Sequence, residues 1–312
     1  MVYRLLDITR TYALEKLSVA AELDTTRERH AARCLALMEQ ARDDWELTAT
    51  QPWIDRYAPL REDIRAALDW GLGDQSTHLL GIRLTVSAMP LWQELSLLGE
   101  HGLYVGKALA RLAQSPAPNP HLHMALQLAL GSFSYHTQGG TPQTIDAFAY
   151  ARRLAEANND LSGQLRAVSG HMAVNLCCGN YRQALAQSLH FDQLGPQAVP
   201  LLDLSAQRLR VLAQHFAGDQ ALAQHNAEQV IQRMAHSGHL NRFTHGFGVQ
   251  YDQGVASLTI LARILWLRGF PERAWRTANQ ALELALQINH GTSICYTLAL
   301  AGVVIARYNG DA

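Results

Sequence analysis

The chain has 312 residues, 48% of them hydrophobic and 17% charged, and its 26 basic and 27 acidic residues leave a formal charge of −1. That length and apolar content suffice for one large or two medium domains. The near-neutral charge, without a run of Lys and Arg, argues against direct nucleic-acid binding, which depends on neutralising phosphates. No stretch of roughly 18 uninterrupted apolar residues suggests a membrane span, and the charged first residues do not form a signal peptide. We therefore expect a cytoplasmic protein without membrane contact.

The cysteines are consistent with a reducing compartment. They form neither a disulfide framework nor a Cys-x-x-Cys metal pair. We expect each to be a small buried apolar side chain. The four are Cys34, Cys177, Cys178 and Cys295.

Apolar residues recur at helical spacing along almost the whole chain. Ala, Leu, Gln, Glu and Arg, all good helix formers, dominate these segments, and no run of alternating Val, Ile, Thr and aromatic residues predicts a sheet. Short breaks rich in Gly, Pro or Asn separate roughly 14 helices of ordinary length. Clear helical segments are, in chain order, 5–17, 64–72, 209–217, 256–269 and 292–308.

Several of the breaks resemble one another and predict a repeat. The glycine can end the first helix of a pair in a left-handed conformation, and a small residue soon afterwards lets the second helix pack closely. A turn glycine is followed five residues later by an alanine in three pairs: Gly179 with Ala184, Gly218 with Ala223, and Gly269 with Ala274.

The spacing of these turn glycines shows where the repeat is interrupted. They lie 39 and then 51 residues apart, and Gly310 follows 41 residues after the last of them. The longer interval holds an insertion on the order of 11 residues. We expect it in a loop at 236–250, which is rich in Gly, Asn and His.

The predicted fold is all-α: an antiparallel helix-pair repeat that forms a tetratricopeptide-like α-solenoid. Ala227 and Ala278 match the small position of the second tetratricopeptide helix. The first helices lack the usual Trp, Leu-Gly and Tyr, and the period is nearer about 40 than 34 residues, so the repeats are degenerate. Because no partner helix follows 292–308, we expect that helix to expose an apolar face and the solenoid to continue in a longer protein.

Motifs for catalysis and metal binding fail on spacing. The nearest approach to a phosphate loop, Gly102 to Lys107, has three residues between its glycines instead of four, and no Ser or Thr follows the lysine. The histidines within 121–123 and 236–245 have no cysteine nearby and lack the ligand spacing of a zinc site. We therefore predict no metal, no cofactor and no catalytic residue. A helical enzyme that uses these histidines is the weakest alternative.

One helix face offers a candidate binding groove. Arg263 and Trp266 are three residues apart and so share a face of one first helix. In a tetratricopeptide-like stack this face lines the concave surface, where Arg166 and Arg208 occupy broadly similar places. The four residues would form a mildly cationic groove for an acidic peptide or a small anion. The alternative is an ordinary solvated helix face.

A family resemblance adds to this interpretation. Segments 3–17 and 27–39 resemble the junction at which STAND-class (NB-ARC-like) ATPases pass from a winged-helix module into a helical sensor region. Segments 61–72, 89–100 and 261–274 resemble the helical half of bacterial transcriptional regulators. Those regulators combine an OmpR-type winged-helix DNA-binding domain, such an ATPase and a tetratricopeptide-like tail.

The resemblance implies a division of the chain. Residues 1–24 would be the remnant helix of an absent winged-helix and ATPase module. Residues 25–115 would be a helical linker with the first helix pairs, and residues 116–312 degenerate tetratricopeptide-like repeats truncated at the C-terminus.

The resemblance also implies a role. The chain would be a non-catalytic sensor domain that binds a protein or peptide partner, or a small-molecule inducer, and controls the ATPase and DNA-binding modules of its parent regulator. The family's P-loop and DNA-reading helix have no counterpart in this sequence, so ATP hydrolysis and DNA binding are not carried over. The alternative is a free-standing tetratricopeptide-like scaffold that binds a partner peptide.

Overall fold

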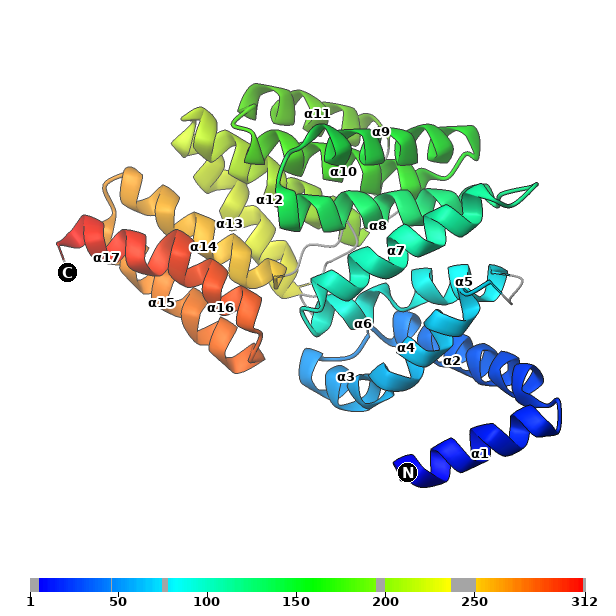
Figure 1. Cartoon of the computed structure of the whole chain (residues 1–312). Coiled ribbons are helices and arrows are strands. Elements are labelled where there is room, and N and C mark those ends of the chain that lie inside the picture. The colour runs from blue at the N-terminus through cyan, green and yellow to red at the C-terminus, as the bar shows by residue number, and fades with distance from the viewer. Residues whose placement is uncertain (1–5, 46, 75–77, 195–199, 237–250, 311–312) are drawn as a thin grey trace.

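A computed structural model describes residues 6–45, 47–74, 78–194, 200–236 and 251–310. Within these ranges the chain consists of helices joined by short turns and has no strand (Figure 1), as the helical periodicity predicts. The predicted loop at 236–250 lies outside the described residues except for His236, which ends a helix.

The helices fall into an N-terminal and a C-terminal group. The first group comprises α1 (Asp7–Val19), α2 (Leu23–Trp45), α3 (Thr50–Tyr57), η1 (Ala58–Leu60), α4 (Arg61–Gly71), α5 (Leu79–Ser87), α6 (Met89–Glu94) and α7 (Leu98–Ala113). The second comprises α8 (Pro120–Gln138), α9 (Pro142–Ala157), α10 (Leu161–Cys177), α11 (Tyr181–Gln193), α12 (Pro200–Ala217), α13 (Gln220–His236), α14 (Gln253–Leu267), α15 (Pro271–Ile288), α16 (Gly291–Thr297), the π-helical turn η3 (Leu298–Gly302) and α17 (Val303–Asn309).

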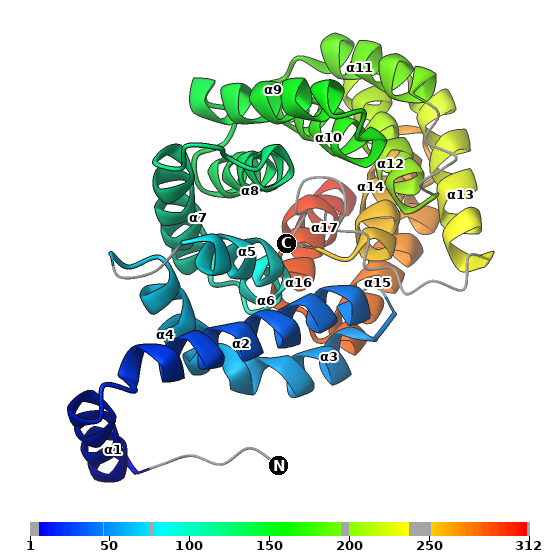
Figure 2. The same ribbon diagram turned by 90° about the vertical axis from the view of Figure 1, so that its right-hand side faces the viewer.

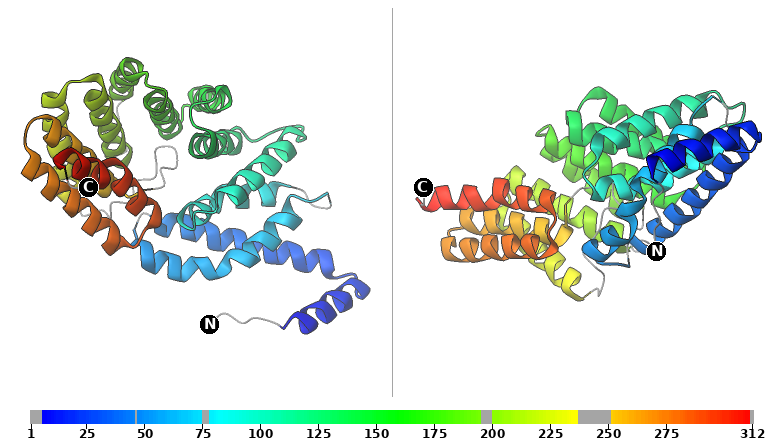
Figure 3. Two further views of the ribbon diagram at one scale, coloured as in Figure 1. Left: turned by 60° about the vertical axis from the view of Figure 1, so that its left-hand side comes forward. Right: turned by 60° about the horizontal axis from the view of Figure 1, so that its bottom comes forward.

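From α8 onward the helices alternate between two rows of a curved stack. Helices α8, α10, α12 and α14 lie on the inside of the curve, and α9, α11, α13 and α15 lie on its outside (Figure 2). Each helix packs against the next along the chain, and the inner helices also pack against one another, α8 on α10, α10 on α12 and α12 on α14. Figure 3 shows the resulting arc from α1 at one end to α17 at the other. This arrangement confirms the predicted helix-pair solenoid.

The turn glycines end the inner helices as predicted. Gly179, Gly218 and Gly269 have φ of 77°, 98° and 82°, a left-handed conformation that is costly for residues with a Cβ atom. The alanine five residues after each of them is fully buried. The repeated Gly and Ala therefore set the tight turn and the close packing of each helix pair.

Two glycines make room for an outer helix between two inner ones. Phe148 of α9 is fully buried. A Cβ atom on Gly131 of α8 would lie 2.8 Å from its ring, and one on Gly170 of α10 would lie 2.4 Å from it. Both distances are far inside van der Waals contact, so the two bare backbones are what lets the Phe148 ring fit between α8 and α10.

The N-terminal helices have a core that reaches into the repeats. Met38, Trp53 and Trp92 are fully buried in it. The Trp53 indole also donates its N–H to the Ala41 carbonyl over 2.8 Å, which satisfies a polar group that would otherwise be costly to bury. Leu126 of α8 belongs to the same core, and so the two groups of helices are packed together.

The prediction that the cysteines are buried is right for one and wrong for three. Cys34 of α2 is buried, whereas Cys177, Cys178 and Cys295 are exposed. Cys177 and Cys178 lie where α10 ends and the chain turns outward, so the apolar sequence before them does not bring them into the core. Burial raises the pKa of the Cys34 thiol to about 12.

The predicted helix 292–308 contains the π-helical turn and exposes an apolar face. Leu298, Val303 and Tyr308 are exposed on it, as expected. By length and composition the stretch Gly291–Asn309 could cross a membrane, although polar residues interrupt its apolar sequence. In the structure it packs against α14 and α15.

Candidate ligand-binding site on the inner helices

The four residues predicted to line a groove fall on one stripe of the repeat. Arg166 of α10 lies thirteen residues before Gly179, the turn glycine that follows this helix. Arg208 of α12 lies ten residues before Gly218, the turn glycine that follows α12. Arg263 and Trp266 of α14 are six and three residues before Gly269. Steps of three and four residues follow one helix face, so all four belong to the same face of the inner helices.

This stripe faces the neighbouring inner helix more than open solvent. Only 1% of Arg208 is exposed, and Arg166, Arg263 and Trp266 are half-buried. Thr259 of α14 and Thr297 of α16 occupy the positions that correspond to Arg208 and Arg166, ten and thirteen residues before a turn glycine. Their Oγ1 atoms are 3.2 Å apart, so these positions form contacts between neighbouring inner helices. The stripe is therefore an interhelical seam with polar side chains in it.

Arg208 is a buried cation without a carboxylate partner in the part of the chain that the structure describes. Its Nε–H donates to Oε1 of Gln253 over 2.5 Å, and its Nη1 and Nη2 have no hydrogen-bond partner among the described residues. The buried carboxylate of the same helix is different, because Asp203 accepts a hydrogen bond and an ion pair from Arg233 at 2.8 Å. Burying an unpaired charge is costly, so Arg208 marks a place where an anion would be favoured.

Two tyrosines stack beside this guanidinium. The rings of Tyr251 and Tyr296 have centroids 4.2 Å apart and an interplanar angle of 21°. Arg208 Cζ lies 5.5 Å from the Tyr251 centroid, within cation–π range. The Tyr296 hydroxyl is buried and has no hydrogen-bond partner among the described residues. The cluster thus joins Arg208 of α12, Tyr251 just before α14, and Tyr296 of α16.

Burial governs the ionisation of this cluster. It raises the pKa of the Tyr296 phenol well above its usual range, and the nearby Tyr251 adds to the rise while Arg208 opposes it. Burial also raises the pKa of Tyr135 of α8, with a further rise from Tyr251. Both phenols therefore stay protonated at neutral pH, and the hydroxyl of Tyr296 remains a donor.

Arg263 and Trp266 have contacts that tie α14 to the terminal helix. Arg263 Nη1 donates to the Leu300 carbonyl in η3 over 3.3 Å. The Trp266 indole donates to Asn309 Oδ1 over 2.9 Å and its ring lies 4.4 Å from that of Tyr308. Arg263 also lowers the pKa of the Tyr296 phenol, so it lies near the cluster. Trp266 only packs α14 against the terminal helix.

The structure does not gather the histidines into a metal site among the residues it describes, where no group of three or more His, Cys, Asp or Glu could hold a metal ion. His123 lies edge-on to Tyr150 at 4.9 Å. Of the group at 236–245, only His236 is described, and its Nδ1 contacts the Gln232 carbonyl at 2.7 Å.

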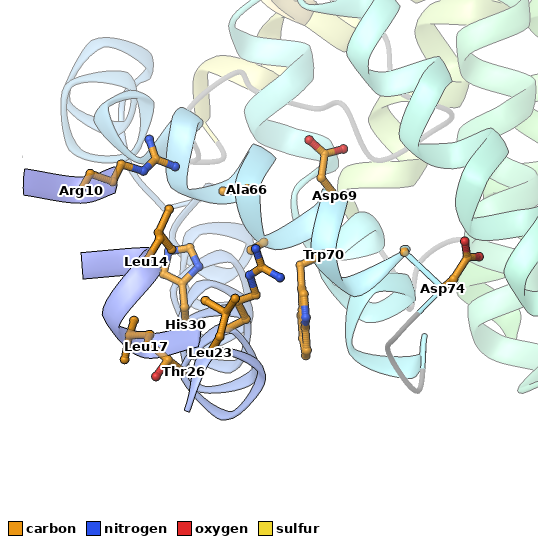
Figure 4. Close-up of a pocket in the computed structure, with 13 residues that line it drawn as sticks. Arg10, Leu14, Leu17, Leu23, Thr26, His30, Ala66, Asp69, Trp70 and Asp74 are labelled. Carbon is orange, nitrogen blue, oxygen red and sulfur yellow. The ribbon is translucent and has the colours of Figure 1, made fainter. Parts of the chain in front are cut away.

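A second candidate site is a groove of about 650 Å³ between α1, α2 and α4. Figure 4 shows Leu14 and Leu17 of α1 on one side and Trp70 of α4 on the other. Arg10 and Asp69 add opposite charges to its lining. The groove is thus apolar at its centre and mixed in charge, which suits a protein contact more than a charged small molecule.

The opposite face of α1 exposes three large apolar side chains, with the charged Glu15 and Lys16 between them. Ile8 is 86% exposed, Tyr12 60% and Val19 80%. Their spacings of four and seven residues place them on one side of the helix, away from the side that carries Leu14 and Leu17. Figure 1 shows α1 at the edge of the molecule, packed beside α2.

Comparison with known proteins identifies no family for this chain. No protein-family model matches the sequence, and no curated protein is significantly similar to it.

Proposed function

We propose that the chain is the non-catalytic sensor and partner-binding domain of a STAND-type transcriptional regulator and controls its ATPase switch. The observation that carries the proposal is the exposed apolar stripe of α1, formed by Ile8, Tyr12 and Val19. This helix lies in the segment that resembles the junction between the ATPase and the sensor region. Clustered large apolar side chains in water are typical of a protein–protein contact, and the proposed occupant is the ATPase module.

The mechanism would be differential binding. An effector held by the inner helices would favour one packing of the solenoid, and the ATPase module bound to α1 would respond to that packing. The groove between α1, α2 and α4 supports this proposal, because unfilled space under α1 allows the helix to change its packing without displacing the core.

The proposal predicts that a P-loop ATPase is encoded beside this chain, and the test is complex formation between the two proteins. The two proteins are co-expressed, and the complex is measured by size-exclusion chromatography with light scattering. The double variant Ile8→Glu, Tyr12→Glu should abolish the complex because it places two charges in the apolar contact. Leu189→Glu on α11, where Leu189 is 64% exposed, should leave it intact.

Thermal unfolding of the isolated variants separates binding from folding. All of the substituted side chains are exposed, so Tm should change little in either variant. A chain that forms no complex with the ATPase, or a complex that survives the α1 variant, contradicts the proposal. The free-standing peptide-binding scaffold would then be the better explanation.

A further inference from the structure

We infer that Arg208 receives a single oxyanion group, a carboxylate or a phosphate, of a small ligand held between α12, α14 and α16. The inference deepens the proposed function, because it names the chemical class of the effector. It rests on that function only for the regulatory role of the ligand.

The charge of Arg208 requires a counter-charge that the described residues do not supply. Its side chain is 1% exposed, so water cannot solvate the guanidinium as it solvates a surface arginine. Another cation of the same helix is paired differently: Arg210, two residues along and on the opposite face, binds Asp192 at 2.6 Å. The segment 237–250 contains no Asp or Glu that could neutralise Arg208.

The open edge of the guanidinium has the geometry of an oxyanion receptor. Gln253 occupies the Nε–H, which leaves the Nη1 and Nη2 edge, and two parallel N–H groups match the two oxygens of a carboxylate or phosphate. Gln253 Nε2 also donates to the Tyr251 carbonyl over 3.3 Å, so its own amide is oriented. The guanidinium is thereby held in one orientation before a ligand arrives.

A third donor and two aromatic faces complete the site. The Tyr296 hydroxyl has no hydrogen-bond partner among the residues described, and it is held in the Tyr251 stack next to Arg208. A protonated phenol and two guanidinium N–H groups favour an anion and offer nothing to a cation.

Enclosure decides between the two ligands that the sequence left open. Both Arg208 and its partner Gln253 are buried, with 1% and 0% exposed. An acidic peptide needs a groove open along its length, whereas a small anion needs only a pocket at the guanidinium. The burial therefore argues against an extended peptide and leaves a small anion as the ligand.

The experiment uses sodium phosphate and sodium acetate as probes, with sodium chloride at matched ionic strength as the reference. Thermal unfolding of the full chain is followed over a concentration series of each salt. We expect at least one oxyanion to raise Tm saturably above the chloride reference, because a ligand that binds only the folded state stabilises it. The salt that does so distinguishes a carboxylate site from a phosphate site.

Arg208→Met removes the receptor and keeps the apolar stem. It should weaken the apparent affinity for the oxyanion by at least about tenfold, since it removes two charged hydrogen bonds. Arg210→Met is the matched control, because it makes the same change two residues away on a side chain already paired with Asp192. It should leave the affinity unchanged.

Tyr296→Phe tests the third donor with a minimal change of shape. It should weaken the affinity several-fold, on the order of one hydrogen bond, and it decides the matter if Arg208→Met does not fold. No rise in Tm above chloride, an equal response in Arg208→Met, or an unchanged affinity in Tyr296→Phe overturns the inference. None of these results affects the α1-dependent complex, so the two proposals fail separately.

Discussion

Gln253 accepts the Nε–H of Arg208 over 2.5 Å, across 45 residues of chain. Gln253 is the first residue of α14 and is fully buried. The bond therefore joins two inner helices of neighbouring repeats at the point where the repeat spacing is irregular. It also occupies one of the three nitrogens of the Arg208 guanidinium, which has no carboxylate partner among the described residues.

Gln253→Leu is expected to lower the free energy of unfolding by about 1–3 kcal/mol, because it leaves Arg208 Nε buried and without an acceptor. The same substitution in an Arg208→Met background should cost less, since no donor is then stranded. Denaturant unfolding of the two single variants and the double variant measures this coupling. Additive effects would mean that the hydrogen bond contributes nothing.

Gly170→Ala is expected to destabilise the protein by about 1–3 kcal/mol, because the added methyl group overlaps the buried Phe148 ring. The matched control is Gly106→Ala in α7, where a Cβ atom has nothing within 4 Å. That substitution should stabilise the protein by up to about 1 kcal/mol through helix propensity. Equal effects of the two substitutions in denaturant unfolding would refute the close fit of α9 between α8 and α10.

Stability should fall as the pH drops from about 6.5 towards 4. Burial, with a smaller contribution from the nearby His136, lowers the pKa of His101 from 6.5 to about 4. Below pH 6.5 the unfolded chain binds a proton at this residue that the folded chain does not, so unfolding becomes easier. The loss for this one group approaches about 3 kcal/mol once the pH is below both pKa values.

The variant His101→Leu isolates that contribution. Neither ring nitrogen of His101 has a hydrogen-bond partner among the described residues, so an apolar side chain of similar size should raise stability at neutral pH. It should also reduce the loss between pH 6.5 and 4, measured by denaturant unfolding at each pH. His121→Gln, a change at an exposed residue, should keep the loss of the parent chain; an unchanged loss in His101→Leu would contradict the assignment.

Thiol labelling should separate the cysteines into two kinds. Cys177, Cys178 and Cys295 are exposed and should react with an aromatic disulfide reagent in the native protein. Cys34 should react only on unfolding, because burial raises its pKa to about 12 and shields the sulfur. Cys34→Ala should remove the slow reaction alone, as followed by absorbance of the released thiolate. A slow phase that persists in this variant would assign it to another cysteine.

The architecture could be predicted from the sequence because the repeat depends on local chemistry. A turn glycine and a small residue five positions later determine the helix pair at Gly179 and at Gly218, and both signals are short-range. The exposed thiols of Cys177 and Cys178 were missed because helical periodicity does not say where along its length a helix leaves the core.

The candidate site could be predicted only in part. Arg208 stands out as a cation on the right face, but its burial arises from packing between repeats, which no local pattern encodes. Tyr251 precedes α14, and Tyr296 belongs to the short helix α16. Neither tyrosine belongs to a recognisable sequence motif for ligand binding, and only the fold brings them to Arg208.

The π-helical turn η3 keeps the terminal helix in phase with α14. Thr297 contacts Thr259, and twelve residues later Asn309 accepts the hydrogen bond of Trp266. In an uninterrupted α-helix, twelve residues rotate by about 120° beyond three full turns, so the two side chains could not both point at one straight neighbour. A π turn absorbs one residue, and the remaining eleven close to within about 20° of three turns. The extra residue thus works as a phase correction, and a one-residue deletion within 298–302 combined with a regular helix would leave the contacts at both ends aligned.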